Sequence, residues 1–403
     1  MLLNRERAER KMITCHLEAL VASSPANVLY TSDSFLNGQA FTLLPRDRNI
    51  EPALIAPISD PTPIVLMSPP WINDIRYYGE FYTTTKTAKE PLTEPERKMV
   101  KAQGSWDRTK EKNPATLLCN LLIERGITRG KIGVDESNLP HEHSFWQKLT
   151  NALPGLEGVP ARNIFREIRM VKTPEEIDRI QEAARITEKA WESALEQTKE
   201  GMTEREFGEI YQHTIISEGG NVVSLGGMYG APIAFGRRTA FVDIAQPSGY
   251  RLKKGDLIRF DGGCRYLGYY SDMARSAVLG QPNAKQQKYY NAIYKGEQLA
   301  IEMAKPGVKP STIFNAAVEA VREEIPHYHR NHTGHGLGIE GYDPPLISPD
   351  VETPLEEGMV LCFETPYYEI GWAGLMVEDT AVIENKPRLL TRSSGELLPV
   401  RGL

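Results

Sequence analysis

Apolar and polar positions alternate along the chain in two different ways, and the change falls near residue 170. Up to about residue 165, short apolar runs are separated by charged segments of helical spacing. We interpret NVLYTS, PALIAP and TPIVLMS as buried strands, and ATLLCNLLIERG as a helix that precedes a strand at KIGVDES. The charged segment from about 85 to 112 is expected to be an exposed excursion. This alternation of strand and helix is typical of a small α/β domain, which we place at residues 1–165.

After residue 170 the pattern becomes helix, helix and strand, and this order occurs twice. A capping box with a first-turn proline at 173–176 predicts a helix that runs to Gly201, and Thr203 with Glu206 predicts a second helix. The order returns with a helix around YYNAIYKGEQLAIEMA, a stop at Pro306-Gly307 and a helix around STIFNAAVEAV. The repeated order predicts two related halves.

Each half contains a strand that ends on an acid. LKKGDLIRFD (252–261) and LEEGMVLCFE (355–364) both place glycine six residues before the last carboxylate, Asp261 or Glu364. A partner strand follows in each half, and Asp272 and Glu378 both lie four residues after a glycine. The nearly constant offset between corresponding positions indicates an internal duplication. Two hairpins related by a pseudo-two-fold axis would bring all four carboxylates into one interior.

The bulk composition limits the possible partners and the compartment. With 403 residues the chain exceeds the usual size of one hydrophobic core, so two domains are expected. The net charge of −6 argues against nucleic acid or an anionic membrane as a partner. We find no apolar run of bilayer length, no signal-peptide pattern and no CxxC among the four cysteines. A cytoplasmic protein is therefore expected.

Four acids on neighbouring strands would repel one another, and in a partly dry interior they require compensating cations. The alternative is that they face solvent at strand ends, as most acidic side chains do. The matched repeat and the motif HTGHGLGIEGYDPP (332–345) favour the interior, because His335 lies between glycines that allow close backbone approach. Four carboxylates and one imidazole suit two divalent cations, such as Mn²⁺, Co²⁺, Fe²⁺ or Zn²⁺, about 3.5–4 Å apart.

The order of these motifs resembles that of the pita-bread metallopeptidase family, which includes methionine aminopeptidase, aminopeptidase P and prolidase, with creatinase as a relative. Asp261 and Asp272 lie eleven residues apart and are followed by GHGLG, GMVLCFETP and a VED strand. The resemblance covers about 165 to 395 and implies a metal-dependent catalytic domain at 166–403. Residues 1–165 resemble the creatinase/prolidase-type N-terminal domain. The implied fold class is an α/β N-terminal domain followed by an α+β pita-bread domain with an internal pseudo-two-fold duplication.

The resemblance also implies a role for each ligand. Asp261 would chelate one cation, and His335 and Glu364 would hold the other. Asp272 and Glu378 would bridge the two. Glu364 would in addition carry a proton from the attacking water. Among the candidate metals we favour Mn²⁺, and a homodimer is expected by the same analogy.

Two histidines that contact the substrate in the family's peptidases are absent here. By the family's spacing they would lie about seventeen residues before Asp261 and seven after His335, which are the positions of Ile244 and Tyr342. Residues 214–326 and 336–403 contain no histidine. Family peptidases also tend to carry arginine where this chain has Met376. Loss of one oxyanion donor typically costs about 10²–10³ in rate, so a changed substrate chemistry is expected.

These departures define the remaining candidate residues. Ile244, His332 and Met376 are candidates to line the substrate site. Tyr342 and Asp343 are candidates for a replacement acid–base or orienting group. Tyr342, which is followed closely by two prolines, could instead be a packing residue, and His332 could cap its strand.

Three functions remain open at this point. The first is a dinuclear metal-dependent hydrolase of the Xaa-Pro peptidase type that acts on a C–N bond of a small molecule or dipeptide. The second is a non-peptidase member of the family, either a metal-dependent lyase of the type that splits dimethylsulfoniopropionate or a creatinase or ectoine-hydrolase type. The creatinase and ectoine-hydrolase types lose metal ligands that this chain keeps. The third is a binding protein without catalysis, against which the retention of five ligands argues.

Overall fold

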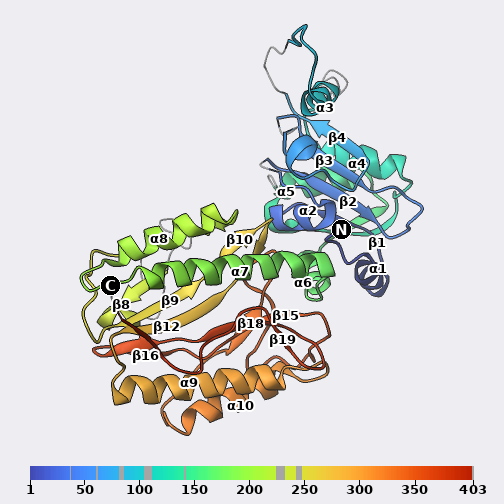
Figure 1. Cartoon of the computed structure of the whole chain (residues 1–403). Coiled ribbons are helices and arrows are strands. Elements are labelled where there is room, and N and C mark those ends of the chain that lie inside the picture. Colours follow the sequence, from blue (N-terminus) through green and yellow to red (C-terminus); the bar gives the residue numbers. More distant parts are fainter. Residues whose placement is uncertain are drawn as a thin grey trace. The chain divides into compact units, whose positions relative to one another are not determined.

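The computed structural model describes residues 1–36, 38–59, 62–80, 86–103, 111–139, 142–223, 232–241 and 247–401. The chain divides into two compact units, Met1–Arg169 and Met170–Leu403 (Figure 1). No helix of the described ranges is both long and apolar enough to cross a bilayer.

The first unit is built on a six-stranded sheet in the order β4-β3-β2-β1-β5-β6. Its strands are β1 (Leu17–Ala22), β2 (Phe41–Pro45), β3 (Ala53–Pro57), β4 (Asp74–Tyr78), β5 (Gly130–Val134) and β6 (Leu156–Pro160). Its helical segments are α1 (Arg5–Thr14), α2 (Pro25–Ser32), η1 (Pro63–Met67), α3 (Glu94–Gln103), α4 (Pro114–Glu124), η3 (Glu136–Asn138), α5 (Glu142–Ala152) and α6 (Arg162–Arg169). β2 is antiparallel to both neighbours, whereas the other pairs are parallel. Apolar side chains of α4 and α5 pack on the sheet, which gives an α/β core.

Two segments of this unit that were interpreted as strands are helical. NVLYTS lies in α2, because Ser24 accepts a hydrogen bond from the backbone N–H of Asn27 and Pro25 occupies the first turn. TPIVLMS contains the short π-helical segment η1. The other runs are confirmed, since PALIAP contains β3, ATLLCNLLIERG contains α4 and KIGVDES contains most of β5. Within the charged excursion, α3 has no buried residue, and residues 85 and 104–110 lie outside the described ranges.

The second unit contains two helix pairs and a nine-stranded sheet. The helices are α7 (Pro174–Glu196), α8 (Glu204–Ser217), α9 (Ala284–Met303) and α10 (Pro310–Arg322), and η4 (Gly236–Ala240) is a 3-10 segment. The strands of the large sheet are β8 (Ile233–Phe235), β9 (Leu257–Gly262), β12 (Met273–Leu279), β13 (Gly334–Gly336), β14 (Asp343–Leu346), β15 (Val360–Glu364), β18 (Glu378–Val382), β19 (Arg388–Leu389) and β20 (Leu398–Val400). Smaller sheets contain β7 (Asn221–Val222), β10 (Cys264–Tyr266) and β11 (Tyr269–Tyr270), and β16 (Tyr367–Glu369) with β17 (Ala373–Leu375).

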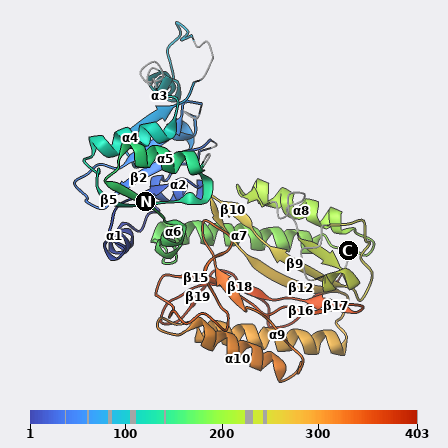
Figure 2. The same ribbon diagram turned by 180° about the vertical axis from the view of Figure 1, so that it is seen from behind.

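The strand order of the large sheet confirms the predicted duplication. The path β13-β15-β18-β12-β9-β8 reads as the second half followed by the first half in reverse, so β13, β15 and β18 correspond to β8, β9 and β12. The α7–α8 pair lies along the β9–β12 half and the α9–α10 pair along the β15–β18 half (Figures 1 and 2). The two halves meet where Ala274 of β12 pairs with Glu378 of β18.

The starts of the first helix pair are confirmed, but the helix ends differ from the prediction. Thr173 and Thr203 both form the predicted capping boxes. However, α7 ends at Glu196 and not at Gly201, whose N–H donates a hydrogen bond to the carbonyl oxygen of Leu252 at 2.8 Å. Gly201 therefore serves the turn after the helix, with a φ of +83° that suits glycine. In the second half, α9 likewise ends at Met303, before the predicted stop.

Alternation along the central strands leaves one face of the sheet for polar side chains. On β9, Ile258 and Phe260 belong to the core that includes α7 and α8. On β15, Leu361 and Phe363 belong to the core that includes α9 and α10. Because successive side chains of a strand point to opposite faces, the acids at positions 261 and 364 share the face turned away from the helices.

Candidate metal centre

The four predicted acids lie on or directly beside four neighbouring strands, β15, β18, β12 and β9, at the middle of the large sheet. Asp261 pairs with Ala274, Ala274 with Glu378, and Glu378 with Glu364. Asp272 immediately precedes β12. The duplicated hairpins therefore deliver their carboxylates to the seam between the two halves.

His335 reaches this seam from β13, and the glycines beside it are required by close backbone approach. A Cβ atom on Gly334 would lie 2.1 Å from the carbonyl oxygen of Cys362, and one on Gly336 would lie 2.4 Å from that of Pro344. The Nδ1 atom of His335 lies 3.1 Å from the Gly336 carbonyl oxygen, so Nδ1 is the protonated nitrogen if it donates there. Nε2 is then available to a ligand on the side of the acids.

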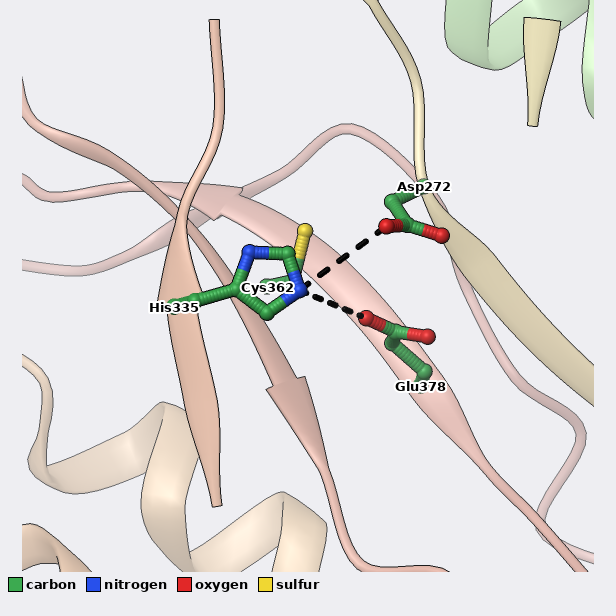
Figure 3. A group of neighbouring side chains, drawn as sticks. All are labelled: Asp272, His335, Cys362 and Glu378. Carbon is green, nitrogen blue, oxygen red and sulfur yellow. Dashed lines mark ion pairs between the residues drawn. The ribbon is translucent and has the colours of Figure 1, made fainter. Parts of the chain in front are cut away.

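Asp272, His335, Cys362 and Glu378 form one compact group. The His335 Nε2 atom is 3.8 Å from Asp272 Oδ2 and 3.8 Å from Glu378 Oε1 (Figure 3). One ligand atom from each of the four residues, the Cys362 sulfur included, lies within 4.8 Å of all the others. Cys362 was not predicted as part of the site, although its position two residues before Glu364 on one strand places both side chains on one face.

Mutual repulsion makes this group unfavourable without a cation. Burial, followed by the charges of Asp261 and Glu364, holds the pKa of Asp272 well above its usual range. Burial, followed by the charges of Asp272, Glu364 and Asp261, does the same for the pKa of Glu378. The pKa of the buried His335 is lowered, chiefly by burial, so its imidazole is neutral and able to bind a cation.

Glu364 and Asp261 lie beside the group of four rather than within it. Burial of Glu364 opposes its ionisation, but His332 and Arg330 outweigh burial and hold its pKa below the usual range. Arg330 donates from Nη2 to Glu364 Oε2 at 3.0 Å, and the His332 Nε2 atom lies 2.9 Å from Oε1. His332 therefore faces Glu364 and does not simply cap its strand. Arg330 was missed, because a single arginine in HYHRNHTGHG has no spacing that distinguishes it.

Tyr342 lies over the centre. Its ring stacks on His335, with the centroids 3.7 Å apart and the planes inclined by 18°. Burial, then Glu364, Glu378, Asp272 and Asp261 in turn, raise the pKa of Tyr342 far above its ordinary value. Its side chain is 55% exposed, so one face of the ring packs while the rest remains open to a substrate.

The remaining predicted residues lie in different surroundings. The Asp343 carboxylate is buried 4.0 Å from the ammonium group of Lys172, and it is not a member of the group of four. Met376 is buried, and its sulfur accepts a hydrogen bond from the Tyr368 hydroxyl at 3.7 Å. Ile244 lies outside the described residues.

A buried ion pair supports the strand that carries Glu378. Asp379 accepts hydrogen bonds from Arg275 at 2.9 Å, from the Thr391 hydroxyl at 2.9 Å and from the Ser393 backbone N–H at 2.6 Å. Arg275 also donates to the carbonyl oxygen of Glu378 at 2.6 Å. This network holds the β18 backbone against β12 and thereby fixes the direction of the Glu378 side chain.

The donor set fits divalent metal ions. Carboxylates and a neutral imidazole are ligands that borderline and hard divalent cations share, and a thiol extends the set towards softer ions such as Zn²⁺. The raised pKa values of Asp272 and Glu378 express a repulsion that a cation would remove. The residues present therefore fit a metal centre.

Comparisons with known proteins identify the family of this chain. A family model described as metallopeptidase family M24 matches residues 178–385. An Xaa-Pro dipeptidase of Pyrococcus furiosus is 34% identical over 238 residues, which are 59% of this chain and 67% of that protein. An Xaa-Pro dipeptidase of Pyrococcus horikoshii is 32% identical over 265 residues, which are 65% of this chain and 74% of that protein.

Among solved structures, an Xaa-Pro dipeptidase from Bacillus anthracis has a TM-score of 0.77 at 20% identity, with 98% of both chains covered. An X-Pro aminopeptidase from Thermotoga maritima has a TM-score of 0.74 at 22% identity, with 98% of this chain and 99% of that chain covered. At these identities the likeness concerns the fold. It confirms the expected fold class, an α/β N-terminal domain followed by a pita-bread domain.

Proposed function

Because the chain belongs to metallopeptidase family M24, we propose that it is a metal-dependent hydrolase of the Xaa-Pro peptidase type, which cleaves the C–N bond of a small dipeptide. The observation that carries this proposal is the convergence of Asp272, His335 and Glu378 at the seam between the two halves. The substrate class comes from the Xaa-Pro dipeptidases to which the chain is similar.

The proposed cofactor is a pair of divalent cations, with Mn²⁺ favoured, and the proposed ligands are Asp261, Asp272, His335, Glu364 and Glu378. Cations bound there would polarise the substrate carbonyl group and lower the pKa of a water molecule. The mutual repulsion of the acids supports two cations rather than one. A single divalent ion would leave part of the negative charge of the acids uncompensated.

The proposed proton carrier is Glu364. Arg330 and His332 favour its ionised form, so its carboxylate can accept a proton from the attacking water and return it to the departing nitrogen. His332 would also line the substrate site beside Glu364. This pairing explains why a carboxylate among other acids can remain a base at neutral pH.

Tyr342 is the proposed hydrogen-bond donor to the substrate carbonyl oxygen. Its raised pKa keeps the phenol protonated at neutral pH, and its stacking on His335 fixes the ring beside the metal ligands. A neutral donor there can stabilise the negative charge that develops on that oxygen. Asp343, held by Lys172, would orient the strand that follows Tyr342 rather than touch the substrate.

The same proposal extends to the organisation of the protein. The unit Met1–Arg169 would be the creatinase/prolidase-type N-terminal domain, and Met170–Leu403 the catalytic domain. Ile244 and Met376 would line the substrate site. A cytoplasmic homodimer is proposed by analogy with the family, and light scattering of the purified protein would test the oligomeric state.

The proposed activity is tested with Mn²⁺-loaded protein and a panel of Xaa-Pro dipeptides, of which Gly-Pro is the first. Release of proline that is lost on chelation and restored by Mn²⁺ is the expected result. The Glu364→Gln variant provides the background, because it keeps the shape of the side chain but not its basicity. Turnover by the natural chain no greater than that background would refute the proposal.

A non-peptidase activity is the second candidate, and Ile244 and Tyr342 favour it because they replace the two histidines that the family's peptidases carry. A metal-dependent lyase of the dimethylsulfoniopropionate type keeps its metal ligands, as this chain does, and is the nearer parallel than the creatinase or ectoine-hydrolase types. Sulfide release from dimethylsulfoniopropionate by a preparation that leaves every dipeptide intact would favour this candidate.

A further inference from the structure

Arg259 is a buried cation on the same face of β9 as Asp261. It lies two residues before this acid and is 3% exposed. Its Nη2 atom donates a hydrogen bond to the carbonyl oxygen of Phe241 at 3.0 Å. Its Nη1 atom is also buried, and no hydrogen-bond acceptor for it is found in the described part of the chain.

An arrangement of this kind is costly unless a ligand completes it. A guanidinium group remains charged at any physiological pH. A buried donor without an acceptor destabilises the folded state, and it does so more strongly when the group is charged. Arg259 is flanked along β9 by Ile258 and Phe260, and the described residues offer no acceptor for its Nη1 atom, so the arrangement indicates an acceptor that a ligand supplies.

The duplication places Arg259 beside the candidate metal centre. In the second half Cys362 lies two residues before Glu364 and pairs with His335 of β13. In the first half Arg259 occupies the corresponding position and pairs with Ala234 of β8. Since Cys362 belongs to the group of four, the corresponding side chain flanks the same face from the other half. The first half carries only the methyl group of Ala234 where the second carries an imidazole.

Tyr368 connects Arg259 to the centre. The guanidinium carbon of Arg259 lies 5.0 Å from the centroid of the Tyr368 ring, a stacking arrangement that orients the cation. The Tyr368 hydroxyl is close enough to Asp261 and Glu364 for their charges, after burial, to raise its pKa. The Tyr368 ring is therefore near both the cation and the acidic ligands.

We propose that Arg259 binds the free carboxylate of the substrate and so places the adjacent C–N bond at the metal centre. This inference rests on the proposed function and specifies its substrate class: small dipeptides with an ionised C-terminus, in preference to amides or longer peptides. A guanidinium–carboxylate pair is the strong, directional type of hydrogen bond that such recognition requires. Nη1 is the donor that remains for it once Nη2 is engaged by Phe241.

The test compares two substrates that share one scissile bond, Gly-Pro and Gly-Pro amide, on Mn²⁺-loaded protein. For Arg259→Met we expect KM for Gly-Pro to rise about 10-fold to 100-fold, with a smaller change in kcat. For the amide, kcat/KM should stay within about 2-fold of the natural chain. Arg259→Lys keeps the charge, so its KM for Gly-Pro should lie between that of the natural chain and that of Arg259→Met. Arg237→Met, which removes an exposed arginine of η4, is the matched control and should leave both substrates unaffected.

Two outcomes would overturn the inference. An equal loss for the acid and the amide would mean that Arg259 supports the fold, and an unchanged KM for Gly-Pro would mean that it does not touch the substrate. Retention of metal by each variant, measured by elemental analysis, separates these outcomes from loss of the centre. Where Arg259→Met does not fold, the Arg259→Lys variant with the same two substrates decides.

The failure of the proposed function would be recognised separately, because the natural chain would then cleave neither substrate. In that case the inference is tested by binding, through the thermal shift that L-proline and L-prolinamide produce in the Mn²⁺-loaded protein. A shift by L-proline alone, absent in Arg259→Met, would support the carboxylate site. Equal shifts by both probes, or no shift by L-proline, would overturn it.

Discussion

Replacement of Glu378 by glutamine should stabilise the protein without metal and destabilise it with metal. The side chain is 2% exposed and stands among Asp272, Glu364 and Asp261, whose charges raise its pKa after burial. The amide has nearly the same shape but no charge. It therefore removes repulsion from the metal-free centre, and it removes a ligand from the loaded one.

The magnitude follows from the cost of ionising a buried acid. Each pKa unit corresponds to about 1.4 kcal/mol, so a gain of about 1–2 kcal/mol is expected for the metal-free variant at pH 8. For a unit of this size that is a rise in Tm of about 2–8 °C. A metal ion at a hundred times its Kd stabilises the natural chain by about 2.7 kcal/mol, and most of that gain should be missing in Glu378→Gln.

The pH dependence has a definite sign. A carboxyl group whose folded pKa lies above its unfolded value binds its proton more tightly in the folded state, so stability falls as pH rises from the ordinary carboxyl range through the raised folded pKa. The advantage of metal-free Glu378→Gln should therefore shrink on going from pH 8 to pH 5. Differential scanning fluorimetry gives the Tm of the natural chain and of Glu378→Gln under four conditions: chelated or Mn²⁺-loaded, at pH 5 or at pH 8.

Asp379→Asn is the matched control, because it changes the next residue in the same way. Asp379 is the partner of the buried Arg275, so its neutralisation should cost about 3–5 kcal/mol with or without metal. If metal-free Glu378→Gln proved less stable than the natural chain at pH 8, the acids could not be repelling one another as described. The electrostatic reasoning would then be refuted.

Three further predictions concern the proposed reaction. Arg330→Met should raise the pKa of Glu364 and so move the acidic limb of the kcat/KM profile to higher pH, because Arg330 favours the ionised carboxylate; an unmoved limb would contradict this role. Tyr342→Phe should lower kcat by about 10²–10³ while metal content and Tm stay the same, and a variant with full kcat would exclude the hydroxyl as the donor. Cys362→Ser should bind relatively more Mn²⁺ and less Zn²⁺, as measured by elemental analysis after dialysis against both ions. An unchanged ratio of bound Zn²⁺ to bound Mn²⁺ would show that the sulfur does not touch the metal.

The second unit could be predicted well from sequence because its signals are local and repeated. The capping boxes at Thr173 and Thr203 specify helix starts by a few adjacent residues, and the two acid-terminated strands recur with one spacing. In the first unit, NVLYTS was misread because its β-branched and aromatic residues suit strands, whereas the decisive signal was the cap at Ser24. Helix ends such as that of α7 were less certain, since the next glycine served a turn instead.

For the candidate site, the sequence could indicate which residues converge but not how they are partnered. The gathering of Asp272 and Glu378 followed from the repeat, and the place of His335 followed from the glycine-flanked motif GHGLG. The roles of Arg330 and Cys362 did not, because a pairing between residues of different strands depends on register and on side-chain direction. Arg259 is a similar case, since a lone arginine in an apolar strand has no meaning until its surroundings are known.

The central position of β18 has a consequence for synthesis of the chain on the ribosome. Every residue of β12 is buried in the finished protein, yet the strands that pair with its inner edge, β18 and β20, begin only at Glu378 and Leu398. After β12 has emerged and before these strands are synthesised, one edge of β12 remains unpaired. An unpaired strand edge can form hydrogen bonds with strands of other chains and so promote aggregation. Truncated products that stop before Glu378 should therefore aggregate, and a ribosome that pauses in this interval should depend on chaperones.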